Sequence, residues 1–332
     1  MGKPLSLDSF TALDLDGMVF PYRKPIVEPW LRSGETAIIW AASGVGKTFL
    51  CLSIALAVAG GGEVGEWKAP EPRKVLYIDA EMNGDDMQER IRFLLDSEAV
   101  QVPDRETALG NLRLICNQQQ RPGTEFLDLT NLDHHGELLK LARGYDLVVL
   151  DNLTTMSAGM TDENAAAEFK TVQPLFMALK QAGIATVLVH HSNKSGSAMR
   201  GSTALEATFE VILGLKRPAI CKAGSAAFEA TFSKFRARGN ETLAPKTWRL
   251  GEAGWTINEV EPENAKDDPV VLAIRSMNFT SQKEVAEALG LSQGEVSKRI
   301  TKLYAIKALT RAEVTEAFET ARSIKSEDPE AF

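Results

Sequence analysis

The sequence has no hydrophobic run long enough to cross a bilayer. Its longest apolar stretch, at residues 49–59, is far shorter than the roughly 20 residues that a membrane-spanning helix needs. No basic segment followed by an apolar run begins the chain, so we do not expect a secretory leader. Internal repeats are absent as well. We therefore expect a cytoplasmic protein without a membrane partner.

Cysteine is scarce. The three cysteines, Cys51, Cys116 and Cys221, lie far apart in the chain and are odd in number. This spacing argues against a disulfide framework and against a zinc site built on cysteine. It fits a protein that works in a reducing compartment.

A basic charge over the whole chain is also missing. The net charge is −8, which argues against a surface made to coat nucleic acid. The exception is the segment 216–249, in which eight basic residues stand against two acidic ones and give a net charge of +6. Such a segment can attract a polyanion or hold a nucleotide, or it can be an ordinary solvated face. Composition alone leaves both interpretations open.

What the sequence does contain is a phosphate-binding loop. The β-prone run 37–40 leads through small residues into Gly46, Lys47 and Thr48, and an apolar helix follows. A strand, a loop of this kind and a helix form a P-loop, in which backbone N–H groups and the lysine hold nucleotide phosphates. Ala41 replaces the first glycine of the usual pattern, and we expect a modest effect because alanine is the smallest substitute. The expected nucleotide-binding residues are Ser43, Gly44, Val45, Gly46, Lys47 and Thr48.

Three further predicted strands end in polar side chains. Residues 74–81 end in Glu81, residues 145–151 in Asp151, and residues 186–191 in two histidines. Strands that alternate with helices and end in active groups predict an α/β fold with a doubly wound, mostly parallel sheet. The other predicted elements are a helix at about 85–95 with Met87, Ile91 and Leu94 on one face, a strand at 112–116, a helix at 165–182 and an edge strand at 228–235.

The length and the punctuation of the chain predict several segments. The 332 residues suit one large and one small domain. We expect an N-terminal arm at 1–29, an ATPase domain at 30–258, an acidic linker with prolines at 259–269, a helix-turn-helix or winged-helix-like domain at 270–311, and a fraying acidic tail at 312–332. In the small domain, Gly290 separates two helices that face each other through Val285, Val296 and their apolar neighbours.

Hydrolysis of ATP needs a carboxylate that activates water. Many P-loop ATPases carry a glutamate directly after the metal-binding aspartate, but here Asn152 follows Asp151. We assign the base to Glu81 and the binding of Mg²⁺ to Asp151 and Thr48, with ATP as the nucleotide. The simpler alternative for Glu81 is an acid at a helix start, stabilised by the helix dipole.

The paired histidines, His190 and His191, end the predicted strand at 186–191. Neighbouring side chains on a strand point to opposite faces, so the pair cannot easily share one metal ion. One of them can touch the γ-phosphate and act as a sensor of its loss. A purely structural histidine is the alternative.

Six short motifs, in this order, resemble the RepA-type branch of RecA-like hexameric helicases of plasmids, phages and other mobile elements. They are Ser-Gly-Val-Gly-Lys-Thr, Tyr-Ile-Asp-Ala-Glu, Val-Leu-Asp-Asn, Val-His-His-Ser-Asn-Lys, Arg-Gly-Ser-Thr-Ala-Leu-Glu and Lys-Phe-Arg-Ala-Arg. The resemblance covers about residues 30–250. It implies a RecA-like P-loop core, a ring with ATP bound between subunits, and single-stranded DNA in the channel.

The resemblance also implies roles for single residues. Glu81 matches the base, and His191 matches the sensor in preference to its neighbour. Lys234 and Arg236 match a pair that reaches into the ATP of the adjacent subunit, with Arg238 as the substitute if the register slips. These residues, with Lys47, are the expected catalytic set.

DNA contacts are expected in two places. The loop 192–203 carries Lys194 and Arg200, which are candidates for salt-dependent phosphate contacts; ordinary loop solubility is the alternative. In the predicted helix-turn-helix, Lys298 and Lys302 face outward.

The favoured function is an ATP-driven DNA helicase or translocase that acts in the replication of a mobile element or phage. The expected partners are single-stranded DNA, further copies of the chain in a hexameric ring, and a replication protein such as a primase or origin-binding protein. One alternative is a RecA-like recombination or accessory ATPase that forms open filaments. Another is an ATP-switched DNA-binding regulator of replication or partition. A small-molecule kinase has the least support because no acceptor site is visible.

Overall fold

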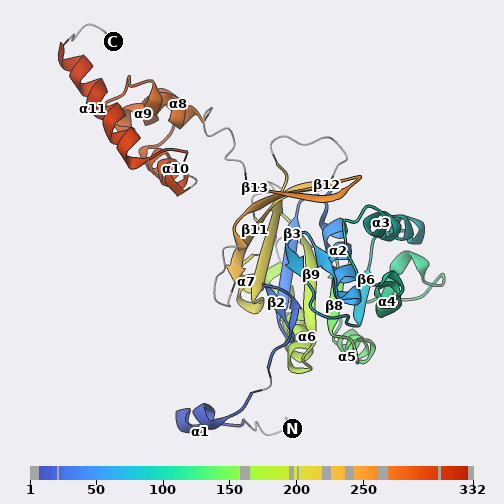
Figure 1. Cartoon of the computed structure of the whole chain (residues 1–332). Helices are drawn as coiled ribbons and strands as arrows, with labels where there is room; N and C mark the ends of the chain where they lie inside the picture. Colours follow the sequence, from blue (N-terminus) through green and yellow to red (C-terminus); the bar gives the residue numbers. More distant parts are fainter. Residues whose placement is uncertain are drawn as a thin grey trace.

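The computed structural model describes residues 7–20, 22–157, 165–193, 198–199, 202–218, 226–235, 243–260, 268–305 and 308–327. An α/β core is followed by a group of C-terminal helices, and a short arm precedes the core (Figure 1). The predicted fold class, a mostly parallel α/β core followed by helices, is confirmed. In the described part of the chain, no helix combines the length and the apolarity needed to span a membrane.

A nine-stranded sheet forms the centre of the core. Its strand order is β13-β12-β11-β10-β3-β9-β8-β6-β7. The strands from β10 to β7 in this order are parallel, and β11, β12 and β13 extend the sheet in antiparallel fashion. Their bounds are β3 Thr36–Ala41, β6 Val75–Asp79, β7 Leu112–Cys116, β8 Leu147–Asp151, β9 Ala185–His191, β10 Val211–Lys216, β11 Ala227–Phe235, β12 Lys246–Gly251 and β13 Gly254–Glu259.

Helices cover both faces of the sheet (Figure 1). One face packs against α2 (Lys47–Gly60), α3 (Gly84–Asp96) and α4 (Arg105–Asn111), and the other against α5 (Leu132–Leu141), α6 (Ala165–Gln181) and α7 (Ser202–Thr208). Successive residues of β3 serve the two cores, since Ile39 joins the first and Ile38 the second, as strand alternation requires. Helix α2 is apolar on all sides and is therefore almost wholly buried.

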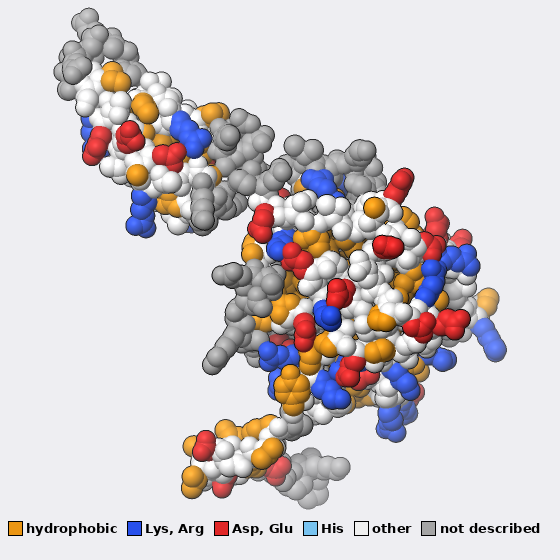
Figure 2. Space-filling model, viewed as in Figure 1, with side chains coloured by type: hydrophobic (Ala, Val, Ile, Leu, Met, Phe, Trp, Pro, Cys, Tyr) orange, Lys and Arg blue, Asp and Glu red, His pale blue; other side chains and the backbone are white. Residues whose placement is uncertain are grey.

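Two short hairpins and an N-terminal arm complete the first part of the chain. The hairpins are β1 (Pro25–Val27) with β2 (Leu31–Arg32), and β4 (Glu63–Val64) with β5 (Trp67–Lys68). The arm contains α1 (Ala12–Gly17), which begins with a capping box at Thr11 and buries no residue. Its apolar side chains are exposed, Leu13 by 82% and Val19 by 97%, and they colour the arm orange in Figure 2.

The predictions for the core elements hold for most of the sheet. The helix expected at about 85–95 is α3, and Met87, Ile91 and Leu94 are its buried residues, as predicted. The prediction that 228–235 forms an edge strand is wrong, because β11 pairs with β10 on one side and with β12 on the other. The sequence analysis did not identify the β12–β13 hairpin, which continues the sheet and takes over the edge.

The C-terminal helices form a small core of their own. They are α8 (Pro269–Arg275), α9 (Gln282–Leu289), α10 (Gln293–Ala305) and α11 (Arg311–Glu327). Gly290, in a left-handed conformation, ends α9, and Ser292 forms reciprocal hydrogen bonds with Glu295 at the start of α10. Val285 and Val296 are buried between the helices, so the two predicted helices are present and packed together, while the helix-turn-helix assignment stays a prediction.

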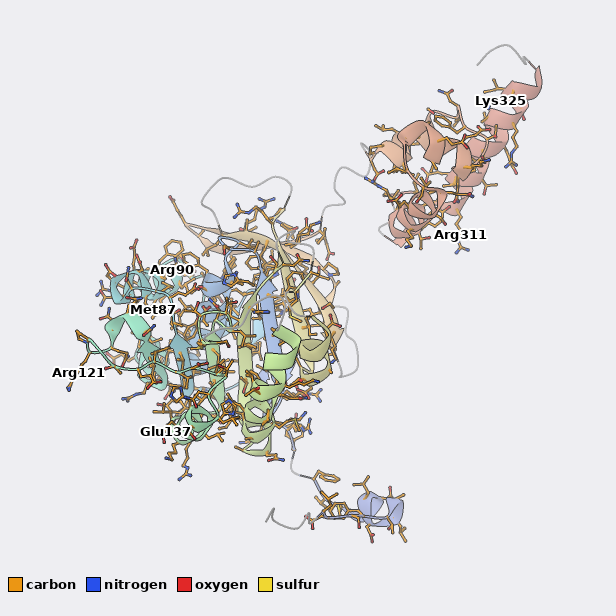
Figure 3. The ribbon with its side chains drawn as sticks, turned by 180° about the vertical axis from the view of Figure 1, so that it is seen from behind. Met87, Arg90, Arg121, Glu137, Arg311 and Lys325 are labelled. Carbon is orange, nitrogen blue, oxygen red and sulfur yellow. The ribbon has the colours of Figure 1, made fainter. Side chains whose placement is uncertain are left out.

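The end of the chain differs from the prediction. The prediction that the chain frays after residue 312 is wrong for the residues up to 327. They belong to α11, which packs on the small core through Val314 and Ala317. Figure 3 shows Arg311 and Lys325 near the two ends of this helix. In the described residues after 268, regular structure is helical only, so no strand of a wing is seen. Most of the predicted linker lies outside the described residues, and the domain boundaries stay predictions.

Candidate nucleotide-binding site

The loop between β3 and α2 has the backbone geometry of a phosphate cradle. Gly44 and Gly46 have φ angles of +71° and +118°, a region that side chains other than glycine rarely enter. Gly46 is the N-cap of α2 and its cap has no side-chain hydrogen bond. The first N–H groups of α2 therefore have no capping side chain, and such groups attract anions. Ala41, the one departure from the P-loop pattern, is the buried last residue of β3 and does not have positive φ.

The side chain of Lys47 lies inside this loop and is buried. Its Nζ donates hydrogen bonds to the carbonyl oxygens of Ala41 at 2.9 Å and Ala42 at 3.0 Å, and lies 3.4 Å from Nδ1 of His191. Burial lowers the pKa of Lys47, although the negative charge of Asp151 acts in the opposite direction. A buried ammonium with these partners is suited to neutralise an anionic ligand.

Asp151 ends β8 and is buried next to the P-loop helix. It accepts a hydrogen bond of 2.7 Å from the hydroxyl of Tyr77, and the side chain of Thr48 also bonds to it. Burial raises the pKa of Asp151 to about 6. A nearby cation would favour its ionised form.

The donor set at this position fits Mg²⁺. A threonine hydroxyl and a carboxylate are hard oxygen ligands, and Mg²⁺ is held in proteins by one or two carboxylates together with water and substrate phosphates. Among the described residues, no group of three or more His, Cys, Asp or Glu side chains could hold a metal ion by itself. Thr48 and Asp151 therefore suit a metal that arrives with a nucleotide.

Glu81 lies beyond the end of β6, in a turn that Asp79 fixes by accepting the backbone N–H of Glu81 at 3.0 Å. Its Oε1 accepts a hydrogen bond of 2.6 Å from the hydroxyl of Thr155. Burial by itself raises the pKa of Glu81, but hydrogen bonds from Thr155 and Asn152 outweigh it, so the pKa is below its usual value. Glu81 is thus an ionised carboxylate held in one orientation and still 52% exposed, as a water-orienting base must be.

The two histidines occupy different environments. His191 lies between the two charged groups of the site, with Nδ1 3.4 Å from Nζ of Lys47 and Nε2 4.0 Å from Oε1 of Glu81. His190 is buried on the other face of β9. The structure therefore brings His191, together with Lys47, Thr48, Glu81 and Asp151, to one edge of the sheet.

Lys234 is not part of this group. It lies near the end of β11 that pairs with the start of β10, opposite Ile212, and its Nζ donates to the carbonyl oxygen of Glu206. Strand β10 is six residues long, from Val211 to Lys216, and its last residue is the one nearest the P-loop. Lys234, opposite Ile212, is therefore roughly 13 Å along the sheet from the P-loop end. Lys234 thus lies toward the opposite edge of the sheet.

Of the remaining residues that were predicted to act at the site or on DNA, the structure describes the side chain of only one. Lys298 is exposed on α10. The side chain of Lys302 and the residues Lys194, Arg200, Arg236 and Arg238 lie outside the described part of the chain.

Sequence reasoning missed four residues of the site: Tyr77, Asn152, Thr155 and Arg217. Tyr77 and Asp151 meet because β6 pairs with β8. Arg217 follows β10, and its Nη2 donates a hydrogen bond of 2.7 Å to the carbonyl oxygen of Gly44. No local sequence pattern predicts these contacts, because each depends on which strands are neighbours in the sheet.

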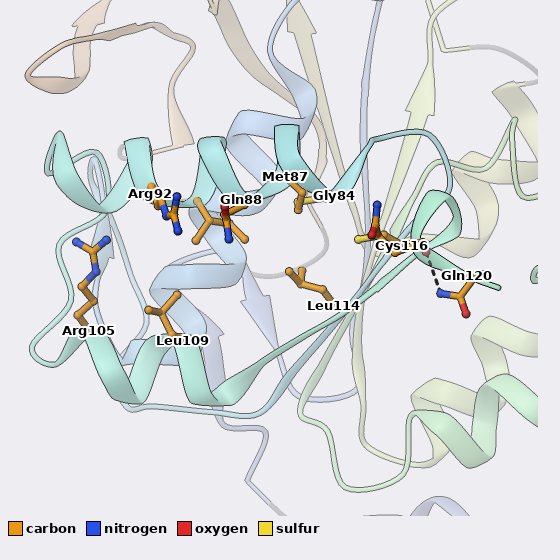
Figure 4. A pocket seen from close by; sticks show the side chains of 11 residues that line it. Gly84, Met87, Gln88, Arg92, Arg105, Leu109, Leu114, Cys116 and Gln120 are labelled. Atoms are coloured by element: carbon orange, nitrogen blue, oxygen red, sulfur yellow. Dashed lines mark hydrogen bonds between the residues drawn. The ribbon is translucent and has the colours of Figure 1, made fainter.

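A cavity of about 600 Å³ lies elsewhere, between α3, α4 and β7 (Figure 4). Met87 and Leu114 supply part of its apolar wall, and Arg92 and Arg105 lie at one end. Arg105 is paired with Asp96 at 2.5 Å. The cavity contains none of the P-loop residues, so it takes no part in the site described above.

Gly46→Ala is expected to weaken the nucleotide site. A Cβ at this position would lie 3.0 Å from the Cβ of Ala226, and φ is +118°, so we expect a loss of about 1 to 3 kcal/mol in unfolding free energy together with weaker binding of ADP. Chemical denaturation and titration with a fluorescent ADP analogue measure both. Gly110→Ala is the matched control, because a Cβ there meets nothing within 4 Å and alanine favours the helix. Equal behaviour of the two variants would contradict the prediction.

The chain matches one protein family and is similar to solved structures. A family model described as an AAA domain matches residues 3–197. The fold is similar to a KaiC-like protein from the hyperthermophilic archaeon Pyrococcus horikoshii OT3, with a TM-score of 0.50, 11% identity, and coverage of 70% of this chain and 93% of that one. It is also similar to a RadB recombinase, with a TM-score of 0.46, 17% identity and the same coverage. Among curated proteins, none matches the chain.

Proposed function

The chain belongs to the AAA domain family and has a RecA-like core, and we propose that it is an ATP-driven DNA helicase or translocase of the RepA type, acting on single-stranded DNA in the replication of a mobile element or phage. One observation carries the proposal. The groups needed to bind and hydrolyse ATP gather at one edge of the sheet, whereas Lys234 lies toward the other edge. A subunit built in this way can offer Lys234 and Arg236 to the ATP of a neighbour.

The residues gathered around the P-loop can carry out the hydrolysis of ATP. Glu81, oriented by Thr155, positions the attacking water and accepts its proton. Lys47 donates hydrogen bonds to the phosphates in place of the carbonyl oxygens of Ala41 and Ala42. Thr48 and Asp151 would hold Mg²⁺, which would neutralise charge on the phosphate oxygens. His191, between Lys47 and Glu81, responds to a change at either group.

Two features support an assembly of several copies. Lys234 is too far along the sheet to serve the P-loop of its own chain. The arm around α1 exposes large apolar side chains, and a six-residue helix that buries nothing is marginal without a partner. A hexameric ring of identical subunits accounts for both, because each subunit then meets a neighbour on two sides.

DNA binding is proposed from charge. Lys194 and Arg200 follow β9 and the sensor candidate His191 in the sequence, so a change at the phosphates can alter the binding of DNA. In the small domain, Lys298 is exposed on α10, and Lys302 lies one turn further along the same helix. Contacts from these lysines would be largely independent of sequence and sensitive to salt. A primase or origin-binding protein remains the expected replication partner.

The test is ATP hydrolysis with and without single-stranded DNA, with particle mass recorded for the same samples. We expect stimulation by DNA and a ring of defined mass. Arg236→Ala and Glu81→Gln should each be inactive alone, and mixed rings should regain part of the activity, because some interfaces then combine an intact Glu81 with an intact Arg236 from the neighbour. Arg121→Ala, an exposed position outside the site, is the control. Failure of the mixture to recover would contradict action between subunits.

One observation favours a second candidate, an ATP-switched DNA-binding regulator. Helices α9 and α10 are capped and share one apolar core, and this supports a helix-turn-helix that reads duplex DNA. In that case hydrolysis would not respond to single-stranded DNA. Open filaments in place of rings would instead point to a RecA-like recombination or accessory ATPase.

A further inference from the structure

Arg217 lies beside the P-loop because of strand pairing. Strands β10 and β3 are parallel neighbours, with Leu215 opposite Ala41. Beyond this pair, β3 enters the P-loop and β10 runs on to Arg217. There the Nη2 of Arg217 donates a hydrogen bond of 2.7 Å to the carbonyl oxygen of Gly44.

The other end of the β10–β11 connection also touches the loop. A Cβ on Gly46 would lie 3.0 Å from the Cβ of Ala226 and 3.5 Å from the ring of Phe228. Arg217 and Ala226 therefore flank the P-loop on the side of β10 and β11. The backbone of the loop is held from this side by the hydrogen bond at Gly44, and Ala226 and Phe228 lie close to it at Gly46.

The bond to Gly44 fixes more than one carbonyl group. The peptide unit between Gly44 and Val45 is planar, so its C=O and its N–H point in opposite directions. When Arg217 holds the carbonyl oxygen, the N–H of Val45 is turned away from Arg217. A guanidinium bond of this kind is charge-assisted and stronger than a neutral one.

Lys47 acts in a comparable way on two other carbonyl groups of the loop. Its Nζ bonds to the oxygens of Ala41 and Ala42. Cationic side chains thus hold three carbonyl oxygens in the stretch from Ala41 to Gly44. When the C=O group of a peptide unit faces a cation, the N–H group of the same unit points away from it. That N–H group is then free to line an anion-binding nest.

We propose that Arg217 is a positioning residue for the phosphates of a nucleoside di- or triphosphate in its own subunit. It orients the Gly44–Val45 peptide so that the N–H of Val45 lines the phosphate cradle, and it adds positive charge beside that cradle. The proposal rests on the proposed function only in requiring that the P-loop binds a nucleotide. It differs from the role proposed for Lys234 and Arg236, which would act on a neighbouring subunit; Lys234 lies toward the opposite end of β11.

The role predicts which nucleotides respond. A P-loop peptide that contacts phosphates common to ADP and ATP changes the affinity for both. A residue that contacted only the γ-phosphate would change the affinity for ATP alone. If Arg217 contributed only positive electrostatic potential at the P-loop, removal of a neighbouring lysine would weaken nucleotide binding to a similar extent. Lys216 is the matched control, since it is exposed, adjacent and of the same charge, and it stands opposite Glu229 in the register of β10 and β11.

The experiment uses the full-length chain and fluorescent analogues of ADP and ATP. For Arg217→Ala we expect both dissociation constants to rise roughly tenfold, KM for ATP to rise in parallel, and kcat to stay within a few-fold of the wild type because Glu81 and Lys47 are untouched. Arg217→Lys, which keeps the charge but not the planar donor fork, should recover part of the affinity. Lys216→Ala should bind both nucleotides like the wild type.

Several results would overturn the proposal. They are an unchanged dissociation constant for ADP, a loss confined to ATP, an equal loss in Lys216→Ala, or a lowered unfolding temperature without nucleotide that accounts for the change in affinity. Stimulation by DNA and complementation between variants play no part in this test. If they fail while Arg217→Ala still weakens ADP binding, the motor proposal falls and the role of Arg217 stands. A wild type that binds neither nucleotide would overturn both.

Discussion

Glu81→Gln is expected to abolish ATP hydrolysis while leaving ATP binding intact. The amide has nearly the shape of the carboxylate and can still accept the hydrogen bond from Thr155, so the site keeps its geometry. It cannot accept a proton from water, and it lacks the negative charge next to His191. Loss of a general base lowers a rate by about 100- to 10,000-fold. Single-turnover hydrolysis, together with titration by a fluorescent ATP analogue, separates the two effects.

The matched control for this variant is Glu89→Gln, in the helix that follows the turn of Glu81. Glu89 is exposed on α3, so the same chemical change there should leave hydrolysis unaltered. If Glu81→Gln retained more than about a tenth of the wild-type rate, the base would lie elsewhere. If it lost ATP binding as well, Glu81 would act chiefly in the structure of the turn after β6.

Lys47→Ala is expected to lose both binding and hydrolysis. The ammonium is buried and bonded to the loop carbonyl groups of Ala41 and Ala42, so its removal deletes the positive charge at the centre of the cradle. It also leaves buried Asp151 without the positive charge that interacts with it. We expect hydrolysis to fall by more than about 100-fold and ADP affinity to fall with it.

Calorimetric titration with ADP and a steady-state hydrolysis assay check this prediction. Lys140→Ala is the control, because Lys140 is a surface residue paired with Glu137 on the same helix and such pairs contribute little. The contrast with Glu81→Gln is the informative outcome. One variant should hold ATP without cleaving it, and the other should not hold it. ATP affinity that survives in Lys47→Ala would show that the loop backbone alone supports binding.

The sequence predicted well those parts of the fold that depend on local patterns. The P-loop, the apolar strands and the spacing of Met87, Ile91 and Leu94 on α3 are visible in short windows of sequence. The β12–β13 hairpin was not predicted from the sequence, because Trp248 lies between charged residues at the end of the basic segment 216–249. Helix α11 was missed because two of the three buried residues that the structure describes in it, Ala317 and Ala321, are small and lie with Val314 within an acidic stretch.

The candidate site shows the same division. Lys47, Glu81 and Asp151 stand out because each follows a recognisable strand. Their partners do not, since the bond from Tyr77 to Asp151 and the bond from Thr155 to Glu81 join residues 74 positions apart in the chain. Arg217 and Gly44 are separated by 173 positions. Only the order of strands in the sheet brings such residues together, and a local pattern does not contain that order.

The strand order also has a consequence for synthesis of the protein. Strand β3, which carries the P-loop, pairs only with strands that come much later, Thr36 with Thr186 and Ala37 with Val211. A ribosome that adds 5–20 residues per second needs roughly 8 to 30 s to make the chain from Thr36 to Thr186. Throughout this time the nascent β3 has no sheet neighbour, while β6 and β7, which pair with each other, can already associate. The P-loop strand is thus placed in the sheet late in translation, and a chain released before residue 211 lacks one of the two strands that hold it.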